Sequence, residues 1–310
     1  MSQGPRFSVV IPTCDRLEFL QQALSSVWAQ TCTEYEVIVV DDGSSDGTWE
    51  WLVSQGSQLR AIRQANRGPG AARNTGARSA RGHYIAFLDS DDLWFPWTLD
   101  VYGYVIRDCR EPSFIAGKPH VFSEQRDQSS AVAGVRSYEQ FADYLASGDQ
   151  WRWWGASSFV IRRDSFEAAD GFTEQWGNGE DADLALRLGL APGFAQVTAP
   201  VTFAYREHEA SAMKDLKRTL AGARSKILAE KAGRYPGRDV RAMERRRILT
   251  RHTRPVTLSC LRKGLGREAW DLYVSTFAWN ASLGRLKFLA AFPFLAVAQQ
   301  FRHRNVARSL

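Results

Sequence analysis

Three carboxylates fall within four positions near residue 90 of this 310-residue chain. Asp89, Asp91 and Asp92 follow directly after the apolar run at 84–88, with Ser90 among them. Like charges this close repel one another unless a positive group lies between them. Mg²⁺ and Mn²⁺ prefer oxygen ligands, so a divalent cation that bridges to a phosphate would satisfy the cluster. A turn followed by a helix N-cap is an equally good explanation, because Asp and Ser favour both.

A second acidic group follows the flexible approach Gly177-Asn178-Gly179. Glu180, Asp181 and Asp183 crowd the first turn of a helix that apolar spacing predicts from 180 to 188. Carboxylates stabilise a helix N-terminus, which explains them without any reaction. A carboxylate beside a cleft can also remove a proton as a general base, so both interpretations stay open.

Alternating strands and helices must position the first cluster. Apolar runs predict strands at 7–13, 36–40, 59–63 and 84–88. Helical spacing predicts helices at 17–30 and 48–53, and a third helix follows the loop at 66–70 and ends at about Ala80. This alternation predicts an α/β fold with a doubly wound, mostly parallel sheet and helices on both faces. Asp41 and Asp42 end the second strand, so we expect them at the same sheet edge as Asp89 and Asp91.

A loop rich in glycine and proline, at 66–70, opens the third helix and brings Arg73 and Asn74 towards the same edge. A helix start of this kind favours an anion. Neither G-x-x-x-x-G-K-[ST] nor G-x-G-x-x-G occurs here. Their absence argues against a P-loop kinase and a dinucleotide-dependent dehydrogenase.

The middle of the chain is less informative. We expect strands at 114–117, 158–162 and 203–208, and a polar loop at 123–131. Trp151, Trp153 and Trp154 form a dense aromatic group. Aromatic faces stack well on sugars and bases, although core packing is the more common use of tryptophan.

The net charge of +6 hides an asymmetry. From Arg206 to the end, 23 lysines and arginines stand against 8 acidic residues, a balance of +15, whereas the preceding residues hold 17 against 26, a balance of −9. A basic segment can face nucleic acid or anionic lipid, and a solvated helical surface explains it equally well. Helices are predicted there at 214–233, 240–250 and 267–280.

An apolar run at 288–298, interrupted by Pro293, comes near the end of the sequence. It is shorter than the roughly 20 residues that a membrane-spanning helix needs. Basic residues flank it, at 285, 287, 302 and 304. This pattern indicates either an interfacial helix on an anionic membrane or a helix packed onto the first domain or a partner chain, as in an oligomer.

The four cysteines are scattered, with no Cys-x-x-Cys pair. This argues against a zinc ribbon and a disulfide framework. The first residues lead straight into a strand and lack the apolar segment of a signal peptide. We therefore expect a cytoplasmic location, with peripheral attachment to the membrane as a further option.

Five segments together resemble glycosyltransferase family 2: residues 9–13, 39–48, 70–74, 87–92 and 179–184. The resemblance covers residues 7–211 and implies a GT-A fold. It also implies an inverting transfer of a sugar from a nucleotide-diphosphate sugar to an acceptor hydroxyl, with Mn²⁺ or Mg²⁺ as cofactor. We then expect a carbohydrate or lipid-linked acceptor, and no nucleic acid as a partner. The catalytic domain would span 1–211 and a basic helical region 212–310.

The resemblance also implies roles for single residues of the nucleotide pocket. Pro12 and Thr13 would line it, Asp42 would bond the base, and Arg73 would lie near the nucleotide. The family often has an aromatic residue and Asn after Pro-Thr, where this chain has Cys14 and Asp15. Asp15 therefore becomes a substrate contact without a stacking ring beside it.

The reacting centre is implied in the same way. Asp89-Ser90-Asp91 matches the family's D-x-D motif, in which Asp91 would ligate the metal and Asp89 would bind the ribose or a metal-bound water. Asp181 matches the catalytic base, next to the substrate contact Glu180. His208 matches a metal ligand that some members supply. We add Trp154 as an aromatic substrate contact.

Two other functions stay open. A sugar-phosphate nucleotidyltransferase uses a similar sheet and acidic metal ligands, but it releases pyrophosphate. A non-catalytic nucleotide-sugar-binding adaptor would use the basic helices to dock. No Gln-x-x-Arg-Trp sequence occurs near the C-terminus, which argues against a processive polysaccharide synthase.

Overall fold

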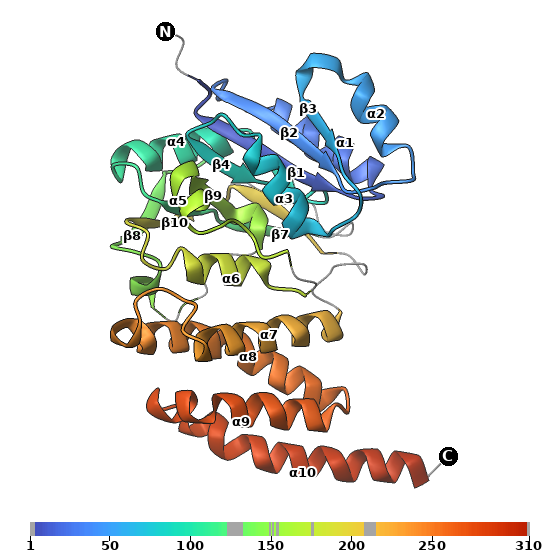
Figure 1. The fold of residues 1–310 in the computed structure, drawn as a ribbon, viewed down its shortest axis with the longest axis vertical. Coiled ribbons are helices and arrows are strands. Elements are labelled where there is room, and N and C mark those ends of the chain that lie inside the picture. The colour runs from blue at the N-terminus through green and yellow to red at the C-terminus, as the bar shows by residue number, and fades with distance from the viewer. Residues whose placement is uncertain are drawn as a thin grey trace. The chain divides into compact units, whose positions relative to one another are not determined.

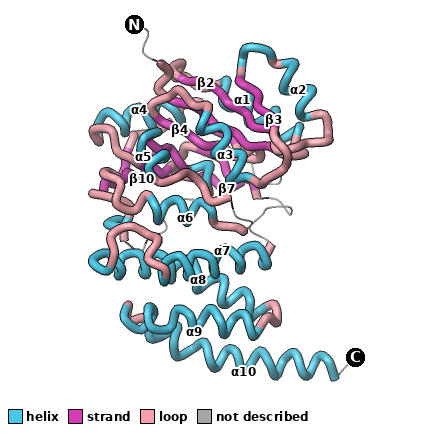
Figure 2. Tube along the Cα trace, in the orientation of Figure 1, coloured by secondary structure: helices cyan, strands magenta, loops and turns pink. Residues whose placement is uncertain are grey.

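The computed structural model describes residues 4–122, 133–148, 150, 152, 155–174, 177–207 and 215–308, with side chains up to residue 299. The chain forms two compact units (Figures 1 and 2). The first comprises Met1–Gln175 and Glu180–Glu209, and the second comprises Trp176–Gly179 and Ala210–Leu310.

A mixed sheet with the strand order β3-β2-β1-β4-β9-β6-β10-β8 forms the centre of the first unit (Figure 1). Strands β1 to β4 are parallel, so their carboxyl ends share one edge of the sheet, as the alternating pattern predicts. The strands of this sheet are β1 (Phe7–Thr13), β2 (Tyr35–Asp41), β3 (Arg60–Arg63), β4 (Tyr84–Phe87), β6 (Phe114–Ala116), β8 (Ser137–Phe141), β9 (Phe159–Arg162) and β10 (Phe194–Ala199).

The sheet departs from a parallel arrangement at two strands. β9 runs antiparallel to both of its neighbours, β4 and β6, and β8 runs antiparallel to β10. The amide of Gly117, just past β6, donates to the carbonyl of Ser158 at 2.7 Å. β9 therefore begins at the edge where β6 ends and has to run back across the sheet.

Helices cover both faces, because alternate residues of a strand point to opposite sides. Val9 and Ile11 belong to a buried cluster that includes α1 and α4. On the other face, α3 comes so close to the sheet that a Cβ on Gly76 would lie 2.4 Å from the Val10 side chain. The first unit's helices are α1 (Leu17–Trp28), α2 (Thr48–Ser54), α3 (Pro69–Arg78), α4 (Thr98–Asp108), α5 (Arg163–Ala168) and α6 (Glu180–Arg187).

A second, smaller sheet has the order β5-β11-β7. Its strands are β5 (Leu93–Trp94), β7 (Pro119–Phe122) and β11 (Phe203–Arg206). Only β11 is predicted from the sequence, because β5 is two residues long and β7 contains proline and histidine. Since β4 ends at Phe87 and β5 starts at Leu93, the acidic residues 89–92 form the turn between the two sheets.

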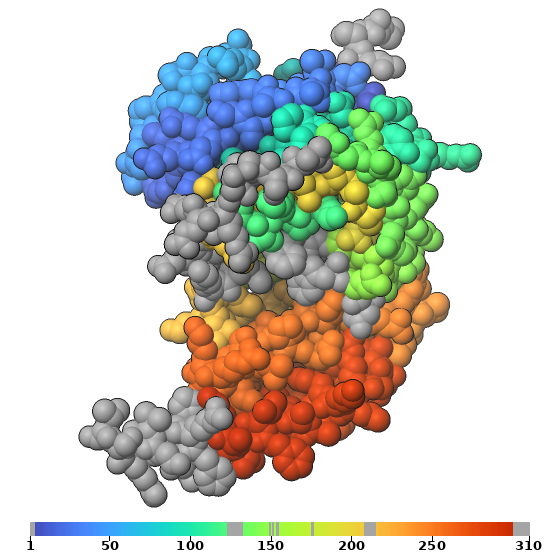
Figure 3. All heavy atoms as spheres, turned by 180° about the vertical axis from the view of Figure 1, so that it is seen from behind, coloured from blue at the N-terminus to red at the C-terminus, as the bar shows by residue number. Residues whose placement is uncertain are grey.

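The second unit is helical, with α7 (Leu216–Lys231), α8 (Ala242–Arg262), α9 (Gly266–Ser282) and α10 (Leu286–Arg308); their packed side chains appear in orange and red in Figure 3. α8 extends beyond its predicted end and contains Pro255. Buried residues past that proline, Thr257 and Cys260, hold the extension in place. α10 packs on α9, where the rings of Tyr273 and Phe292 stack with centroids 4.3 Å apart.

Residues 177–179, directly before α6, are fastened to α7 of the second unit. The amide of Asn178 donates to the carbonyl of Arg218 at 3.1 Å. A Cβ on Gly222 would lie 1.7 Å from the Asn178 carbonyl oxygen, so glycine is required at this contact. Lys226 Nζ lies 3.2 Å from the carbonyl oxygen of Gly179.

Candidate functional site

The acidic turn after β4 forms a compact group of oxygen atoms. One carboxylate oxygen from each of Asp89, Asp91 and Asp92 lies within 4.8 Å of the others. Asp92 is only 2% exposed. Burial, followed by the charges of Asp91 and Asp89, raises the pKa of Asp92 well above its ordinary value. A group of hard oxygen donors that repel one another in this way fits a divalent cation.

Positive groups surround this cluster. Arg16 pairs with the carboxylate of Asp91, and Arg73 pairs with Asp89 at 2.6 Å. The amide of Arg206 donates to Asp92 at 3.0 Å, and its Nε donates to the carbonyl of Asp91 at 2.9 Å. The chain therefore balances much of the negative charge with guanidinium groups.

Arg73 connects the two acidic motifs. Its Nη2 donates to Asp89 at 2.6 Å and its Nη1 donates to Glu180 at 2.9 Å. Burial alone would lower the pKa of Arg73, but the charges of Asp89 and Glu180 outweigh it and raise the pKa above its ordinary value. This bridge brings the first turn of α6 to the acidic turn after β4, although 91 positions separate Asp89 from Glu180.

Asp181 follows Glu180 in the first turn of α6. Its Oδ1 accepts a hydrogen bond from the amide of Ala182 at 2.6 Å. The backbone thus orients the carboxylate next to the residue that Arg73 holds. Asp183 is used differently, since it pairs with Arg187 one turn along the same helix at 2.9 Å.

The other acidic pair, Asp41 and Asp42 at the end of β2, accepts hydrogen bonds from amides of the loops that follow β2 and β3. Asp42 is 4% exposed, and its carboxylate accepts from the amides of Arg67 at 2.9 Å and Gly68 at 2.8 Å. Asp41 accepts from the amide of Ser44 at 3.0 Å. These contacts fix the loops that follow β2 and β3 at the same sheet edge as the acidic turn.

The end of β1 lies between these two regions, because β1 pairs with both β2 and β4. Pro12 and Thr13 are its last residues, and Thr13 is 3% exposed. No partner for the Thr13 hydroxyl lies within hydrogen-bonding distance in the described part of the chain. Asp15 has a φ of 49° and its Oδ1 accepts from the Ser45 amide at 2.7 Å. An unsatisfied buried hydroxyl at a strand end is a suitable contact for a bound ligand.

Four predicted residues remain: Ser90, Asn74, Trp154 and His208. Ser90 is buried at 4% exposure inside the acidic turn. The side chain of Asn74 is bonded to the segment that follows α5, because its amide nitrogen donates to the carbonyl of Phe172 at 2.8 Å. Trp154 and His208, and the loop expected at 123–131, lie outside the described residues.

Sequence reasoning missed the roles of Arg16 and Arg206 in this site. Single arginines in a chain with many basic residues give no local signal. Asp92 carries a signal, since it is the third carboxylate of the cluster, but the D-x-D pattern draws attention to Asp89 and Asp91 alone.

In the described part of the chain, none of the helices combines the length and apolar content needed to cross a bilayer.

Comparison with known proteins finds similarity to glycosyltransferases. Residues 8–129 match the model of the family described as Glycosyl transferase family 2. An uncharacterized glycosyltransferase of Nostoc sp. is 31% identical over 172 residues, which cover 52% of this chain and 52% of that protein. The succinoglycan biosynthesis protein ExoW of Rhizobium meliloti is 38% identical over 182 residues, or 52% of this chain and 56% of that protein. The chain thus spans about half the length of these curated relatives.

Solved structures share the fold. The S. aureus TarS 1–349 structure has a TM-score of 0.67 at 18% identity and covers 95% of this chain and 91% of that one. TarS 1–349 has also been solved with UDP-GlcNAc, with a TM-score of 0.66 at 16% identity. The mannosyltransferase PcManGT of Pyrobaculum calidifontis, solved with GDP-Man and Mn²⁺, has a TM-score of 0.53 at 18% identity and covers 99% of this chain and 87% of that one. These likenesses show the GT-A fold expected from the sequence.

Proposed function

The chain belongs to glycosyltransferase family 2 through its residues 8–129, and on this premise we propose that it transfers a sugar from a nucleotide-diphosphate sugar to an acceptor hydroxyl, with inversion at the anomeric carbon. The observation that carries the proposal is the Arg73 bridge between Asp89 and Glu180. It joins an acidic turn suited to a cation and a diphosphate with a helix start that presents Asp181. The ligands in the TarS and PcManGT structures, UDP-GlcNAc and GDP-Man, belong to the donor class that we propose.

The donor nucleotide would lie at the carboxyl ends of β1 and β2. Pro12 and the unsatisfied Thr13 hydroxyl would contact it from β1. Asp42 would contribute by holding the amides of Arg67 and Gly68 in place beside the base, in addition to any direct contact. Asp15 would fix the loop at 44–45 that closes the pocket on the other side.

Asp91, Asp89 and Asp92 would hold a divalent cation, Mn²⁺ or Mg²⁺, with His208 as a further ligand implied by the family resemblance. A bound divalent cation supplies positive charge that stabilises a leaving diphosphate. Arg16 and Arg73 already lie against these carboxylates, so their guanidinium groups can bind phosphate oxygens once the carboxylates have another partner. Ser90, buried in the same turn, would maintain its shape.

Asp181 would act as the general base. Its carboxylate takes the proton of the acceptor hydroxyl while that oxygen forms a bond to the anomeric carbon. The bond from the anomeric carbon to the diphosphate breaks at the same time, and its electron pair stays on the diphosphate oxygen. Attack opposite to departure inverts the anomeric configuration. Glu180, held by Arg73, and Trp154 are assigned to sugar contacts.

We further propose that the acceptor is a carbohydrate or lipid-linked carbohydrate of cell-envelope polysaccharide synthesis, used at the cytoplasmic face of the membrane. ExoW, named for succinoglycan biosynthesis, favours this context. On α10 of the second unit, Phe294 is 78% exposed and Val297 is 52% exposed. Exposed apolar side chains among arginines and lysines suit an anionic membrane surface. Equal sedimentation of the full chain with anionic and neutral vesicles would contradict this part of the proposal.

A panel of nucleotide sugars tests the donor class. The full chain is heated with each nucleotide sugar and Mn²⁺ or Mg²⁺, because a ligand of the folded state raises the melting temperature. The donor that raises it most is then incubated with the protein, and the released product is identified. Release of the free nucleoside diphosphate supports the proposal, whereas pyrophosphate release indicates a nucleotidyltransferase. Donor binding without any turnover, even with acceptor extracts, indicates an adaptor. Unchanged metal dependence in His208→Ala would remove His208 from the ligand set.

A further inference from the structure

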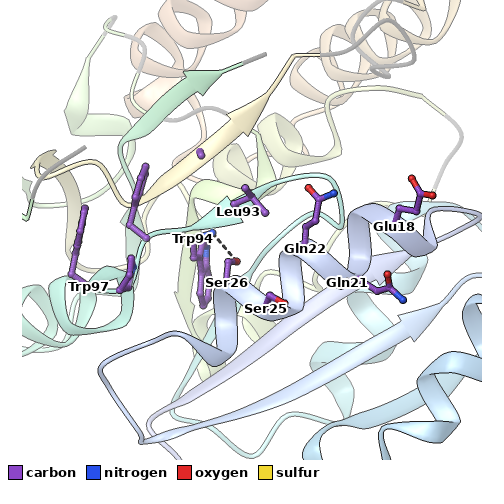
Figure 4. Close-up of a pocket in the computed structure, with 11 residues that line it drawn as sticks. Glu18, Gln21, Gln22, Ser25, Ser26, Leu93, Trp94 and Trp97 are labelled. Atoms are coloured by element: carbon purple, nitrogen blue, oxygen red, sulfur yellow. Dashed lines mark hydrogen bonds between the residues drawn. The ribbon is translucent and has the colours of Figure 1, made fainter. Parts of the chain in front are cut away.

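A cavity of about 790 Å³ lies in the first unit between α1 and the turn after β5 (Figure 4). Its volume falls in the range of small-molecule binding sites, about 300–1,000 Å³. None of the three carboxylates of the acidic turn lines it, so it is separate from the donor site proposed above. Its lining residues come from α1, from 93–97 and from Ala204 of β11.

One wall of this cavity is aromatic and rigid. Phe95 and Trp97 stack with ring centroids 5.2 Å apart and an interplanar angle of 7°. The Trp97 indole nitrogen donates to the carbonyl of Val201 at 2.8 Å, which fixes the orientation of the ring. The amide of Trp94 donates to the Ser26 hydroxyl at 3.0 Å, which ties this wall to α1. Rings held in this way offer flat apolar surface at little cost in side-chain entropy.

The opposite wall is a polar stripe on one helix. Glu18, Gln21, Gln22 and Ser25 are spaced like one face of α1 and project from it along the cavity (Figure 4). Two amides and a hydroxyl provide hydrogen-bond donors and acceptors side by side. Among the residues that the structure describes, no lysine or arginine lines the cavity, and Glu18 is the one charged lining residue.

These walls exclude most classes of small ligand. A phosphate or other anion would meet Glu18 without a cation among the lining residues. A lipid chain would bury the polar stripe without hydrogen-bond partners, which costs free energy. A neutral saccharide satisfies both walls, because the faces of its rings are apolar and its edges carry hydroxyls that both donate and accept.

We propose that this cavity binds a neutral oligosaccharide, namely a part of the acceptor chain away from the hydroxyl that reacts. The inference rests on the proposed glycosyltransferase function and names a second contact for its acceptor. A link to the acidic turn exists through Arg206, whose Nη2 donates to Gln22 Oε1 at 2.6 Å. The same residue bonds Asp92 through its amide and the Asp91 carbonyl through its Nε. A saccharide held at Gln22 therefore lies one side chain away from the residues of the acidic turn.

The test uses the full chain and three neutral probes: cellotetraose, mannotetraose and chitotetraose. Indole N–H signals of the tryptophans are followed by NMR during titration with each probe. We expect at least one probe to shift the Trp97 signal with saturation. The variant Ser25→Trp, which fills the cavity from an exposed position of α1, should weaken that binding at least about tenfold, about 1.4 kcal/mol.

Two further variants make the result specific. Ala29→Trp places the same ring on an exposed position just past the end of α1, outside the cavity lining, and should bind the probe like the wild type. Gln21→Ala removes hydrogen bonds without adding bulk and should weaken binding several-fold, which keeps the test open if Ser25→Trp fails to fold. Lack of a saturable shift with all three probes, or equal binding by Ser25→Trp and Ala29→Trp, overturns the proposal.

The nucleotide-sugar panel separates this outcome from that of the proposed function. If no nucleotide sugar raises the melting temperature but a probe still binds at the cavity, the transferase proposal fails and the saccharide site stands. If a donor binds and turns over while no probe binds, the saccharide site fails alone.

Discussion

Two groups of carboxylates end parallel strands at the same edge of the sheet, yet the chain holds them in different ways. Around Asp42, two backbone amides and a glutamine side chain provide the hydrogen bonds. Around Asp89 and Asp91, the partners are the guanidinium groups of Arg73 and Arg16. Backbone amides are fixed parts of their loops, whereas long side chains can turn to another partner.

The difference separates two roles that look alike in sequence. A carboxylate bonded by backbone amides is a permanent part of the structure, and its removal should destabilise the fold around it. A carboxylate paired with an arginine side chain can release that partner when a cation and a phosphate arrive. We therefore expect the first group mainly to shape the pocket and the second group to take part in the reaction.

Among variants of the two carboxylate groups, Asp91→Asn should have the largest effect on turnover. Loss of this charge weakens the site for the cation and the diphosphate together, so we expect turnover to fall by roughly 10³-fold, as when other transition-state contacts are removed. Nucleotide release from the best donor of the panel measures the effect. Glu50→Gln, an acidic change on the exposed surface of α2, is the matched control and should keep the wild-type rate. An Asp91→Asn enzyme with near-normal turnover would contradict the assigned role.

Arg73→Lys should come next. Lysine keeps the charge but cannot bond Asp89 and Glu180 in the fixed fork of a guanidinium group. We expect kcat to fall about 10²-fold, because small misplacements of reacting groups can cost that much. The melting temperature should also fall, since the partly buried carboxylates of Asp89 and Glu180 lose a bidentate partner. Steady-state kinetics and thermal unfolding check both effects. A change in stability with no change in kcat would limit Arg73 to a structural role.

Asp42→Asn should affect the fold more than the reaction. An Asn amide group would turn a donor towards a backbone amide of Arg67 or Gly68, leaving a buried group unsatisfied. We expect unfolding to become easier by about 1–3 kcal/mol, with a weaker donor affinity and little change in kcat at saturating donor. Urea unfolding and donor titration measure the two effects. A fall in kcat as large as that of Asp91→Asn would erase the distinction between the two groups.

Asp92→Asn should change the stability of the metal-free protein only slightly, and in the opposite direction to Asp42→Asn. The pKa of Asp92 is higher in the folded protein than in the unfolded chain, so stability falls as pH rises through the interval between those two values. Asn stays neutral, and its oxygen can still accept from the Arg206 amide. In EDTA at pH 8 we therefore expect a melting temperature a few degrees above that of the wild type, which corresponds to a gain of about 1 kcal/mol in the free energy of unfolding. Near pH 4 the gain should shrink. A lower melting temperature at pH 8 would contradict the raised pKa.

Much of the fold follows from local patterns. The apolar runs that form β1, β2 and β4 and the helical spacing of α1 are strong enough to be read directly, and β-α alternation then fixes which strand ends share an edge. The antiparallel course of β9 could not be predicted, because it depends on where the preceding chain arrives at the sheet. The two-residue strand β5 has no periodicity to detect.

The site is partly predictable for the same reason. Runs of acidic residues after strands and at a helix start are visible in the sequence, so Asp89, Asp91 and Glu180 can be selected as candidate site residues from the sequence alone. Which positive groups pair with them depends on contacts between distant segments, such as Arg206 with the acidic turn. The sequence also cannot distinguish Asp42 from Asp91, because both are acidic residues after an apolar strand. The difference is that the carboxylate of Asp42 accepts hydrogen bonds from amides of the loop after β3.

If the first turn of α6 supplies the base for a reaction at the acidic turn, Asp181→Asn should separate donor binding from sugar transfer. Calorimetry with the best donor of the panel, together with a transfer assay, measures binding and turnover on the same preparation. We expect donor affinity close to that of the wild type and a transfer rate lower by about 10²–10⁴-fold. Loss of donor affinity, or transfer at the wild-type rate, would show that Asp181 is not the base.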